Sequence, residues 1–225
     1  MKEIKRLIPI LLMITVCCAI MALIDGIVQP GYAAKSAVKM ILFLLCPVGY
    51  LYFDKQLSLQ SILRPNKKGL FIALFLGAGV YILILGAYFS LRNVLDFSAI
   101  ASSLTETVGV NKTNFVFVAL YISFINSFLE EFFFRGFSFL TLKKLAPRKF
   151  AYIASSLYFA FYHMAMMVGW FSPGIYLLAI AGLFVGGLLF NFLNERNRNI
   201  YTSWMVHMFA NFAINTVGFF LFGIF

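Results

Sequence analysis

Two adjacent glutamates, Glu130 and Glu131, lie in the middle of an apolar stretch, and Arg135 follows one helical turn later. A carboxylate in hydrocarbon costs at least about 2.5–3.5 kcal/mol on insertion scales, so such residues are rare and usually functional. Glu131 and Arg135 have the i, i+4 spacing at which an acid and a base neutralise each other on a helix. Glu130 then has no obvious local partner, and we interpret it as the reactive carboxylate, with Glu131 and Arg135 as its scaffold.

The polar residues of this stretch share one face of a helix. They are Ser123, Asn126, Ser127, Glu130, Glu131, Arg135, Ser138 and Thr141. Because lipid cannot satisfy such a face, it must point into a helix bundle. The competing interpretation is that these residues only hold helices together. Two acids for one base would leave an uncompensated charge, however, which simple packing does not need.

The chain has two histidines, and each lies on a polar stripe of its own apolar stretch. Phe159 precedes His163 by one helical turn, and His207 belongs to a ladder with i+4 spacing: Ser203, His207, Asn211 and Asn215. Either stripe alone is typical of structural hydrogen bonding between membrane helices. At 1.5 Å per residue, however, Glu130, both histidines and Asn211 fall in one layer about 10–20 Å from the predicted cytoplasmic helix ends.

A carboxylate, two imidazoles and an amide at one level suit the hydrolysis of a carbonyl by water. Glu130 can take a proton from water, and His163 can orient that water or carry the proton to a leaving amine. His207 and Asn211, one turn apart, can donate hydrogen bonds to the developing oxyanion.

The same residues could instead bind a metal. Glu130, His163 and His207 would form a His₂Glu zinc site with one open position. The compact His-Glu-x-x-His helix of many zinc proteases is absent from the sequence. The sequence therefore leaves both a carboxylate mechanism without a metal and a metal-assisted mechanism open.

Composition identifies the elements that must position these residues. The 225 residues are 62% hydrophobic and 12% charged, whereas a soluble domain has about 25% charged residues. Seven apolar runs approach or exceed the ~20 residues needed to cross a bilayer: 7–28, 37–53, 69–91, 115–142, 150–170, 174–193 and 200–222. We therefore expect an all-α, polytopic transmembrane bundle forming a single integral membrane domain over residues 1–225. The second run is the shortest.

The basic residues predict the orientation of this bundle. If the N-terminus is inside, the cytoplasmic segments hold Lys2, Lys5, Arg6, Lys55, Arg64, Lys67, Lys68, Lys143, Lys144, Arg148, Lys149, Arg196 and Arg198. The outer segments hold only Lys35, Lys39, Arg92 and Lys112. This asymmetry predicts an N-in, C-out protein. The net charge of +10 therefore reflects topology and contact with anionic lipid, and we expect no nucleic-acid partner because no soluble domain carries a basic patch.

Three further features carry no chemistry in our interpretation. Cys17, Cys18 and Cys46 lie in predicted spans without paired spacing, as expected of small buried apolar residues. The first apolar run exceeds the usual 7–15-residue core of a signal peptide, so we expect it to be retained as a span. Segment 92–114 is mildly polar, and the sequence does not decide between a surface helix and a loop.

Three motifs in order resemble the CPBP family of intramembrane proteases (CAAX proteases and bacteriocin-processing enzymes, also called Abi). They are Glu-Glu-x-x-x-Arg at 130–135, Phe-x-x-x-His at 159–163 and His-x-x-x-Asn at 207–211. A sixth run with glycines at 182, 186 and 187 is similar to a less defined third region of the family. The resemblance covers 115–222, which we expect to be the catalytic core, whereas 1–114 would form variable N-terminal spans.

The resemblance implies an intramembrane endopeptidase. Glu130 would be the general base, His163 its partner at the water, and His207 with Asn211 the oxyanion donors, supported by Glu131, Arg135 and Phe159. Members are commonly described as metalloproteases, so a divalent metal such as zinc stays an open alternative. Bacterial members are linked to leader-peptide processing, pheromone maturation and self-immunity to bacteriocins, and this short chain resembles that type. We therefore expect a protein of the bacterial inner membrane that cuts a small peptide or membrane-protein substrate near the cytoplasmic side.

Two other functions stay open at this point, and the oligomeric state is not predicted. The first is a non-catalytic membrane protein that gives bacteriocin immunity or regulates a sensor kinase through its helices. The second is a proton- or metal-coupled transporter, which is disfavoured because the sequence shows neither an inverted repeat nor a pair of broken helices.

Overall fold

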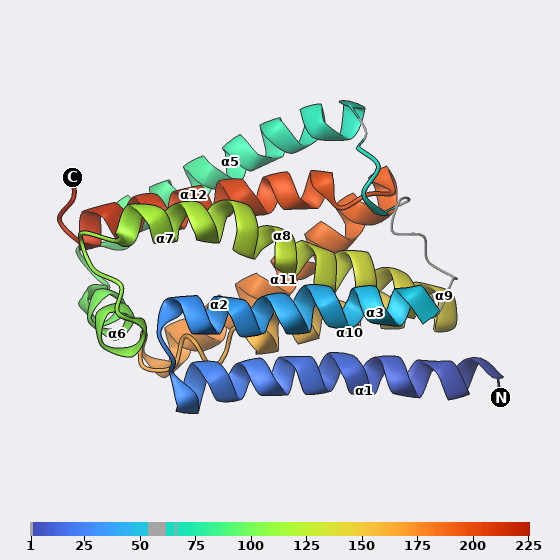
Figure 1. Ribbon diagram of the computed structural model, residues 1–225. Coiled ribbons are helices and arrows are strands. Elements are labelled where there is room, and N and C mark those ends of the chain that lie inside the picture. Colours follow the sequence, from blue (N-terminus) through green and yellow to red (C-terminus); the bar gives the residue numbers. More distant parts are fainter. Residues whose placement is uncertain (1, 54–61, 66) are drawn as a thin grey trace.

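The structure is a computed structural model that describes residues 2–53, 62–65 and 67–225. Every regular element in these ranges is helical, which confirms the all-α fold. Figure 1 shows the N- and C-termini at opposite ends of the bundle, as expected for an odd number of passes. Lys55, which was counted among the cytoplasmic basic residues, lies outside the described residues.

The first two passes form a helical hairpin. Their elements are α1 (Lys2–Leu23), η1 (Ile24–Val28), α2 (Tyr32–Met40), η2 (Ile41–Leu45) and α3 (Cys46–Phe53). Gln29 turns the chain with a φ of 44°, and Pro30 and Gly31 follow before α2 begins. The second pass extends farther outward than predicted, from Tyr32 to Phe53. It includes Lys35 and Lys39, because both lysines are neutralised by buried acids.

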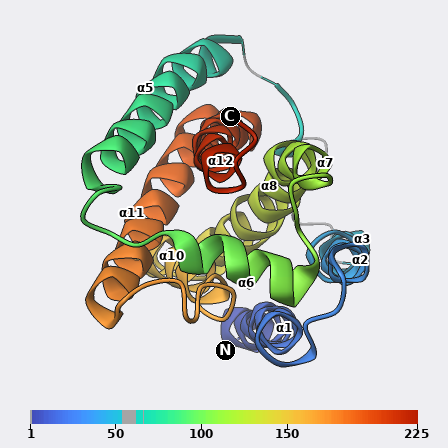
Figure 2. The same ribbon diagram turned by 90° about the vertical axis from the view of Figure 1, so that its left-hand side faces the viewer.

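The next part of the chain contains the helix that carries the two glutamates. Its elements are α5 (Lys67–Leu91), α6 (Ser98–Val108), α7 (Phe115–Tyr121), η3 (Ile122–Asn126), α8 (Ser127–Glu130), η4 (Glu131–Phe139) and α9 (Leu140–Leu145). Segment 92–114, left undecided by the sequence, therefore contains a helix. Figure 2 shows α6 lying across one end of the bundle.

The last three helices complete the bundle. They are α10 (Arg148–Tyr162), α11 (Pro173–Asn197) and α12 (Tyr201–Leu221). Ala146 and Pro147 separate α9 from α10, and Pro173 starts α11, as expected of a residue without a backbone N–H. The side chain of Asn199 accepts the backbone N–H of Tyr201 at 2.9 Å, which caps the start of α12.

Six of the seven predicted spans are present as helices long and apolar enough to cross a membrane within the described residues. The exception is the run predicted at 150–170, where α10 has only 15 residues. The chain leaves the helix after Tyr162 and passes through turns, with Gly169 at a φ of 82°, before α11 begins. Hydropathy alone could not detect this break, because the turn residues are themselves apolar.

Close helix contacts occur where glycines replace side chains. On α5, a Cβ at Gly77 would lie 2.5 Å from the ring of Phe209 on α12. Of the three glycines noted on α11, only Gly187 makes such a contact: a Cβ there would lie 3.0 Å from the Ser156 Cα on α10. A Cβ at Gly186 or Gly182 would meet no atom within 4 Å. Gly187 therefore sets the distance between α10 and α11.

This contact makes a stability prediction with a matched control. Gly187→Ala should lower the free energy of unfolding by about 1–3 kcal/mol relative to Gly186→Ala, because the new methyl group presses on a neighbouring backbone. Both variants add the same helix-favouring methyl group to adjacent positions of one helix. Unfolding in mixed detergent measures the difference, and equal stabilities would mean that α10 and α11 are not packed this closely.

At the end of the bundle predicted to be cytoplasmic, Glu195 on α11 joins three helices. Its carboxylate contacts Lys143 on α9 at 2.6 Å and Arg148 on α10 at 2.7 Å. The Tyr152 hydroxyl donates a further hydrogen bond to it at 2.5 Å. Part of the basic excess on this side therefore also fixes the helix ends. Cys17, Cys18 and Cys46 are free thiols, and only Cys17 is fully buried.

Candidate active site

Glu130 lies at the point where the fourth pass changes its helical geometry. It ends the short α8, which is flanked by the π-helical segments η3 and η4. Such wider turns are frequent at functional sites in α-helices. Glu130 is 2% exposed, whereas Glu131 and Arg135 are completely buried. The polar face predicted for this pass does point into the bundle.

Two histidines from other helices face the Glu130 carboxylate. Oε2 of Glu130 lies 3.7 Å from Nε2 of His163 and 3.7 Å from Nε2 of His207. These distances are too long for direct hydrogen bonds, and a contact of this length leaves room for a water that binds both groups. His163 and His207 follow Glu130 in the sequence by 33 and 77 positions, and both converge on one of its oxygen atoms.

The two histidines have different partners on their other ring nitrogen. Nδ1 of His163 lies 2.7 Å from the carbonyl oxygen of Phe159. Nδ1 of His207 lies 3.0 Å from Oε1 of Glu131. Both partners are acceptors, so each Nδ1 carries the hydrogen and donates it. With Nδ1 carrying a hydrogen, the Nε2 atom of a neutral histidine is an acceptor toward Glu130, whereas a ring protonated on both nitrogens donates from Nε2.

Arg135 completes a buried charge network with Glu131. Its guanidinium nitrogen lies 3.2 Å from Oε1 of Glu131, as the i, i+4 spacing predicted. The guanidinium carbon also lies 4.0 Å from the ring centroid of Phe159 and 4.9 Å from that of Phe190. Phe190 in turn stacks on the His207 ring with a centroid distance of 5.3 Å. Phe159 and Phe190 thus exclude water from the pair and fix both the arginine and His207.

Glu130 is not without a partner, which corrects the interpretation from sequence. Nζ of Lys39 lies 2.7 Å from Oε1 of Glu130, and the Asn126 side-chain amide donates to the same oxygen at 2.9 Å. The Lys39 ammonium also donates to the Asn126 side-chain oxygen. Lys39 is 3% exposed and belongs to the second pass, so it is not one of the outer-segment charges. The signal in the sequence was the excess acid on the fourth pass, which requires a second base.

Asn211 lies one turn after His207 on α12, and its amide is already in use. It donates to the carbonyl oxygen of Ile122 on η3 at 3.1 Å. An amide group carries two hydrogens, and this bond occupies one of them. One turn farther, the Asn215 amide donates to the Ala119 carbonyl oxygen and the Ser123 hydroxyl. The ladder on α12 therefore also binds the fourth pass along its length.

The position of His163 differs from its predicted place deep inside a regular span. It follows Tyr162 directly at the end of α10, where the chain turns toward α11. Trp170 in this turn donates to the hydroxyl of Ser103 on α6 at 3.1 Å. The loops closest to His163 therefore belong to the outer end of the bundle, and not to the cytoplasmic side that we expected to provide the exit.

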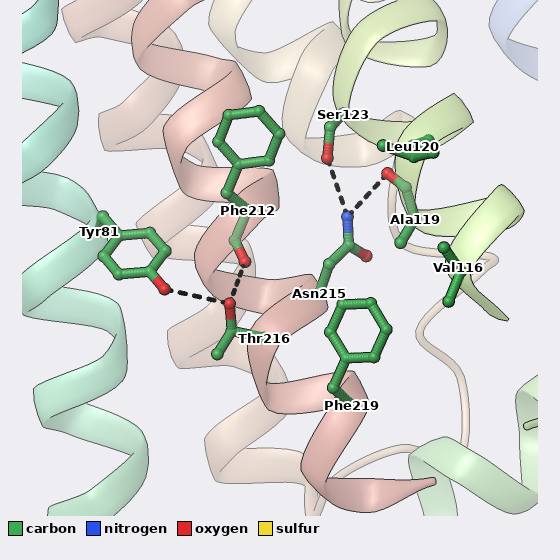
Figure 3. A pocket seen from close by; sticks show the side chains of 9 residues that line it. All are labelled: Tyr81, Val116, Ala119, Leu120, Ser123, Phe212, Asn215, Thr216 and Phe219. Carbon is green, nitrogen blue, oxygen red and sulfur yellow. Dashed lines mark hydrogen bonds between the residues drawn. The ribbon is translucent and has the colours of Figure 1, made fainter. Parts of the chain in front are cut away.

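A cavity of about 370 Å³ lies between α5, α7 and α12. Figure 3 shows the side chains around it, with Tyr81 contributed by α5, Phe212 and Phe219 by α12 and Val116 by α7. Its wall is mostly apolar, and its polar groups are Tyr81, Ser123, Asn215 and Thr216. Ser123 precedes Glu130 by seven residues, roughly 10 Å along a helix. The cavity therefore adjoins the site without containing it.

A comparison with protein-family models covers the segment that contains these site residues. Positions 112–213 match the family model described as type II CAAX prenyl endopeptidase, Rce1-like. This segment is a CAAX protease domain of the CPBP family. It contains Glu130, Glu131, Arg135, His163, His207 and Asn211. No curated protein and no solved structure was found to match the chain.

The match makes residues 112–213 a domain of a family that hydrolyses peptide bonds, and the apolar helices make the chain a multi-pass membrane protein. The matched segment begins after the first three passes. Lys39 is therefore a partner of Glu130 that lies outside the matched segment.

The donor set of this CAAX protease does not fit a preformed metal centre. Oε1 of Glu130 is paired with the Lys39 ammonium, so a dication would meet a carboxylate that another cation already neutralises. Within the described ranges, no group of three or more His, Cys, Asp or Glu side chains is arranged to hold a metal ion. A second buried cation beside Lys39 would also have to be desolvated, at a cost on the order of several kcal/mol. This cost is similar to the free energy gained when the cation pairs with the carboxylate. We therefore derive no step through a metal.

Proposed function

We propose that this CAAX protease hydrolyses a peptide bond inside the membrane with a water molecule activated by Glu130. The observation that carries the proposal is the approach of two imidazole Nε2 atoms to one carboxylate oxygen, each at 3.7 Å. A water at this point would contact a charged base and a proton acceptor together. Glu130 and His207 are buried and His163 is partly buried, which favours reaction in a low-dielectric environment, where such interactions are stronger than in bulk water.

The reaction begins with the attack of water on the scissile carbonyl carbon. Oε2 of Glu130 takes one proton from the water as the oxygen–carbon bond forms. The second hydrogen stays on the water oxygen and donates a hydrogen bond to Nε2 of His163, which orients the water. The carbonyl π electrons move to the oxygen, which becomes an oxyanion. In this proposal His207 enters the reaction protonated on both ring nitrogens, with its Nδ1–H held by Glu131. Its Nε2–H and the second amide hydrogen of Asn211 donate to the oxyanion, and both groups keep their hydrogens throughout.

Collapse of the tetrahedral intermediate completes the reaction. The oxyanion reforms the carbonyl, the carbon–nitrogen bond breaks, and the leaving amine takes the proton held by Glu130, directly or through His163. The products are a new carboxyl end and a new amine end, and Glu130 returns to its charged form. Glu131 and Arg135 do not exchange protons, because they serve to hold His207 in one orientation.

The substrate in this proposal is a small peptide or a membrane-protein segment. The mostly apolar cavity between α5, α7 and α12 supports an apolar segment that approaches from the bilayer. Leader peptides, peptide pheromones and bacteriocin precursors of the bacterial inner membrane belong to this class. The alternative is a non-catalytic membrane protein that gives bacteriocin immunity or regulates a sensor kinase by binding.

A comparison of released peptides tests this proposal. One native-host strain carries the wild-type protein, and the other carries the Glu130→Gln variant. We expect one or more peptides to disappear in the variant strain while their longer precursors accumulate. Identical peptide profiles, together with immunity or signalling that survives the substitution, would instead support the binding function. The variant protein must be present in the membrane at wild-type amounts for the comparison.

Chelation separates the carboxylate mechanism from a metal-assisted one. We expect activity after exhaustive treatment with a chelator to stay within about twofold of the untreated rate, because this mechanism requires no metal-bound water. The measurement is peptide cleavage by purified protein in proteoliposomes. Loss of activity that added zinc restores would contradict the carboxylate mechanism and the role given to Lys39 in the metal-free site.

A further inference from the structure

Among the described residues that make a polar contact with Glu130, Lys39 is the one contributed by the first three passes. It lies on α2, 91 residues before Glu130, and outside the segment that matches the protease family. The lysine side chain is 4% exposed and the Glu130 side chain 3% exposed. Lysine is almost never fully buried unless it is paired. This contact therefore has to be explained by what the ammonium does at the carboxylate.

The contacts divide the Glu130 carboxylate into a held oxygen and a free oxygen. Oε1 accepts from the Lys39 ammonium at 2.7 Å and from the Asn126 amide at 2.9 Å. Oε2 makes neither contact and faces the two Nε2 atoms of His163 and His207 at 3.7 Å each. Rotation of the carboxylate about its terminal bond would break both bonds to Oε1. The lysine thus holds the carboxylate in the orientation in which its other oxygen faces the two histidines.

The ammonium itself is held from several sides. It also donates to the Asn126 side-chain oxygen, which ties it to the turn before Glu130. Nζ lies 4.8 Å from the ring centroid of Tyr162 and 5.6 Å from that of Phe43. Cation–π contacts of this length restrict a buried ammonium further. Tyr162 is the neighbour of His163, so Lys39 joins the second pass to both the base and one histidine.

We propose that Lys39 is a positioning residue of the protease site. It holds Oε1 of Glu130 and keeps the carboxylate charged inside the bundle, so that Oε2 is the atom that takes the proton from the attacking water. This inference rests on the proposed hydrolytic function. It gives the N-terminal passes a direct part in the chemistry, in addition to any part in packing.

Two substitutions at Lys39 test the inference in purified, reconstituted protein. Lys39→Gln keeps a hydrogen-bond donor but removes the charge, and kcat should fall by about 10- to 100-fold, the factor expected for a charge-assisted hydrogen bond. KM should change by less than about twofold, because Lys39 does not touch the substrate. Lys39→Ala should be impaired at least as much, and added propylammonium should raise its rate by about tenfold by replacing the lost ammonium. A neutral propyl compound should give no rescue.

Lys35 offers a matched control on the same helix. It lies one turn before Lys39 and pairs with Asp25 at 2.5 Å, and not with Glu130. The double variant Asp25→Asn/Lys35→Gln removes this buried pair together. Its kcat should stay within about twofold of wild type, because the removed charges do not contact the reacting carboxylate.

Several results would overturn the role of Lys39. These are an unchanged kcat in Lys39→Gln, a loss that appears only in KM, a rescue by the neutral compound, or an equal loss in the Lys35 control. If Lys39→Gln does not fold, the double variant Lys39→Gln/Glu130→Gln should fold, since the buried charges are then removed together. A double variant that also fails to fold would contradict the pairing itself.

The same measurements separate this inference from the proposed function. Full activity of Glu130→Gln would reject the proposed function and, with it, the role of Lys39. An inactive Glu130→Gln beside a fully active Lys39→Gln would reject only the role of Lys39. Slow but measurable turnover of Lys39→Gln, beside an inactive Glu130→Gln, is the combination that we expect.

Discussion

Glu130→Gln is expected to lower kcat by about 10²–10⁴-fold, the range for loss of a general base. Glutamine keeps the shape of the side chain, and its oxygen can still accept from Lys39 and Asn126. Its amide nitrogen takes the place of Oε2, where it has no lone pair available to take a proton from water. The substitution therefore removes the proton acceptor while it preserves the hydrogen bonds around it.

The matched control is Glu106→Gln, the same change at an exposed acid on α6. This variant should cleave a peptide substrate at the wild-type rate. Thermal unfolding in detergent should show that both variants are folded. A Glu130→Gln protein that retains more than about a tenth of wild-type kcat would exclude Glu130 as the general base.

Arg135→Met is expected to lower the free energy of unfolding by about 3–5 kcal/mol, which is more than the loss expected for Gly187→Ala. Arg135 is fully buried, and it compensates the equally buried carboxylate of Glu131 at 3.2 Å. Methionine fills a similar volume but leaves Glu131 as an unpaired charge inside the bundle. It also removes the cation that lies against the ring of Phe159 at 4.0 Å.

A second substitution separates charge compensation from packing. In Glu131→Gln/Arg135→Met, both charges are absent, so most of the lost stability should return. Activity should not return, because His207 then lacks the carboxylate 3.0 Å from its Nδ1. Unfolding in mixed detergent gives the stabilities. A double variant no more stable than Arg135→Met would mean that Arg135 acts by filling space and not by pairing.

The parts of the site that follow from local spacing could be predicted from the sequence. Glu131 and Arg135 are four residues apart on one helix, and their contact is present. The polar face of the fourth pass points inward because the hydrocarbon of the bilayer offers its side chains no hydrogen-bond partners. The predicted depths along three helices place Glu130, His163 and His207 at one level. In the structure, the Nε2 atom of each histidine lies 3.7 Å from Oε2 of Glu130.

The partner of Glu130 could not be found in the same way. Lys39 is 91 residues away on another helix, and no local pattern links the two. Its position near the start of an apolar run made it resemble an outer-segment charge in the topology count. The excess acid on the fourth pass was interpreted as a sign of chemistry alone, although it also required a buried base.

Backbone irregularities were equally hidden from periodicity. The π-helical segments η3 and η4 lie beside Glu130, and the apolar periodicity of the fourth pass does not distinguish them from a regular α-helix. The apolar residues after Tyr162 read as a continuing span, although the chain turns at His163. Phe190, which stacks on His207, is one of many apolar residues on α11, and only the packing of α11 on α12 shows its place.

An experimental structure of the Glu130→Gln variant with a bound peptide substrate tests the account most directly. The account predicts a scissile carbonyl oxygen within hydrogen-bond distance of His207 Nε2 and the Asn211 amide. It also predicts an ordered water between residue 130 and His163, on the side of the carboxylate away from Lys39. A peptide bound elsewhere in the bundle, or a side chain of residue 130 directed toward lipid, would contradict it.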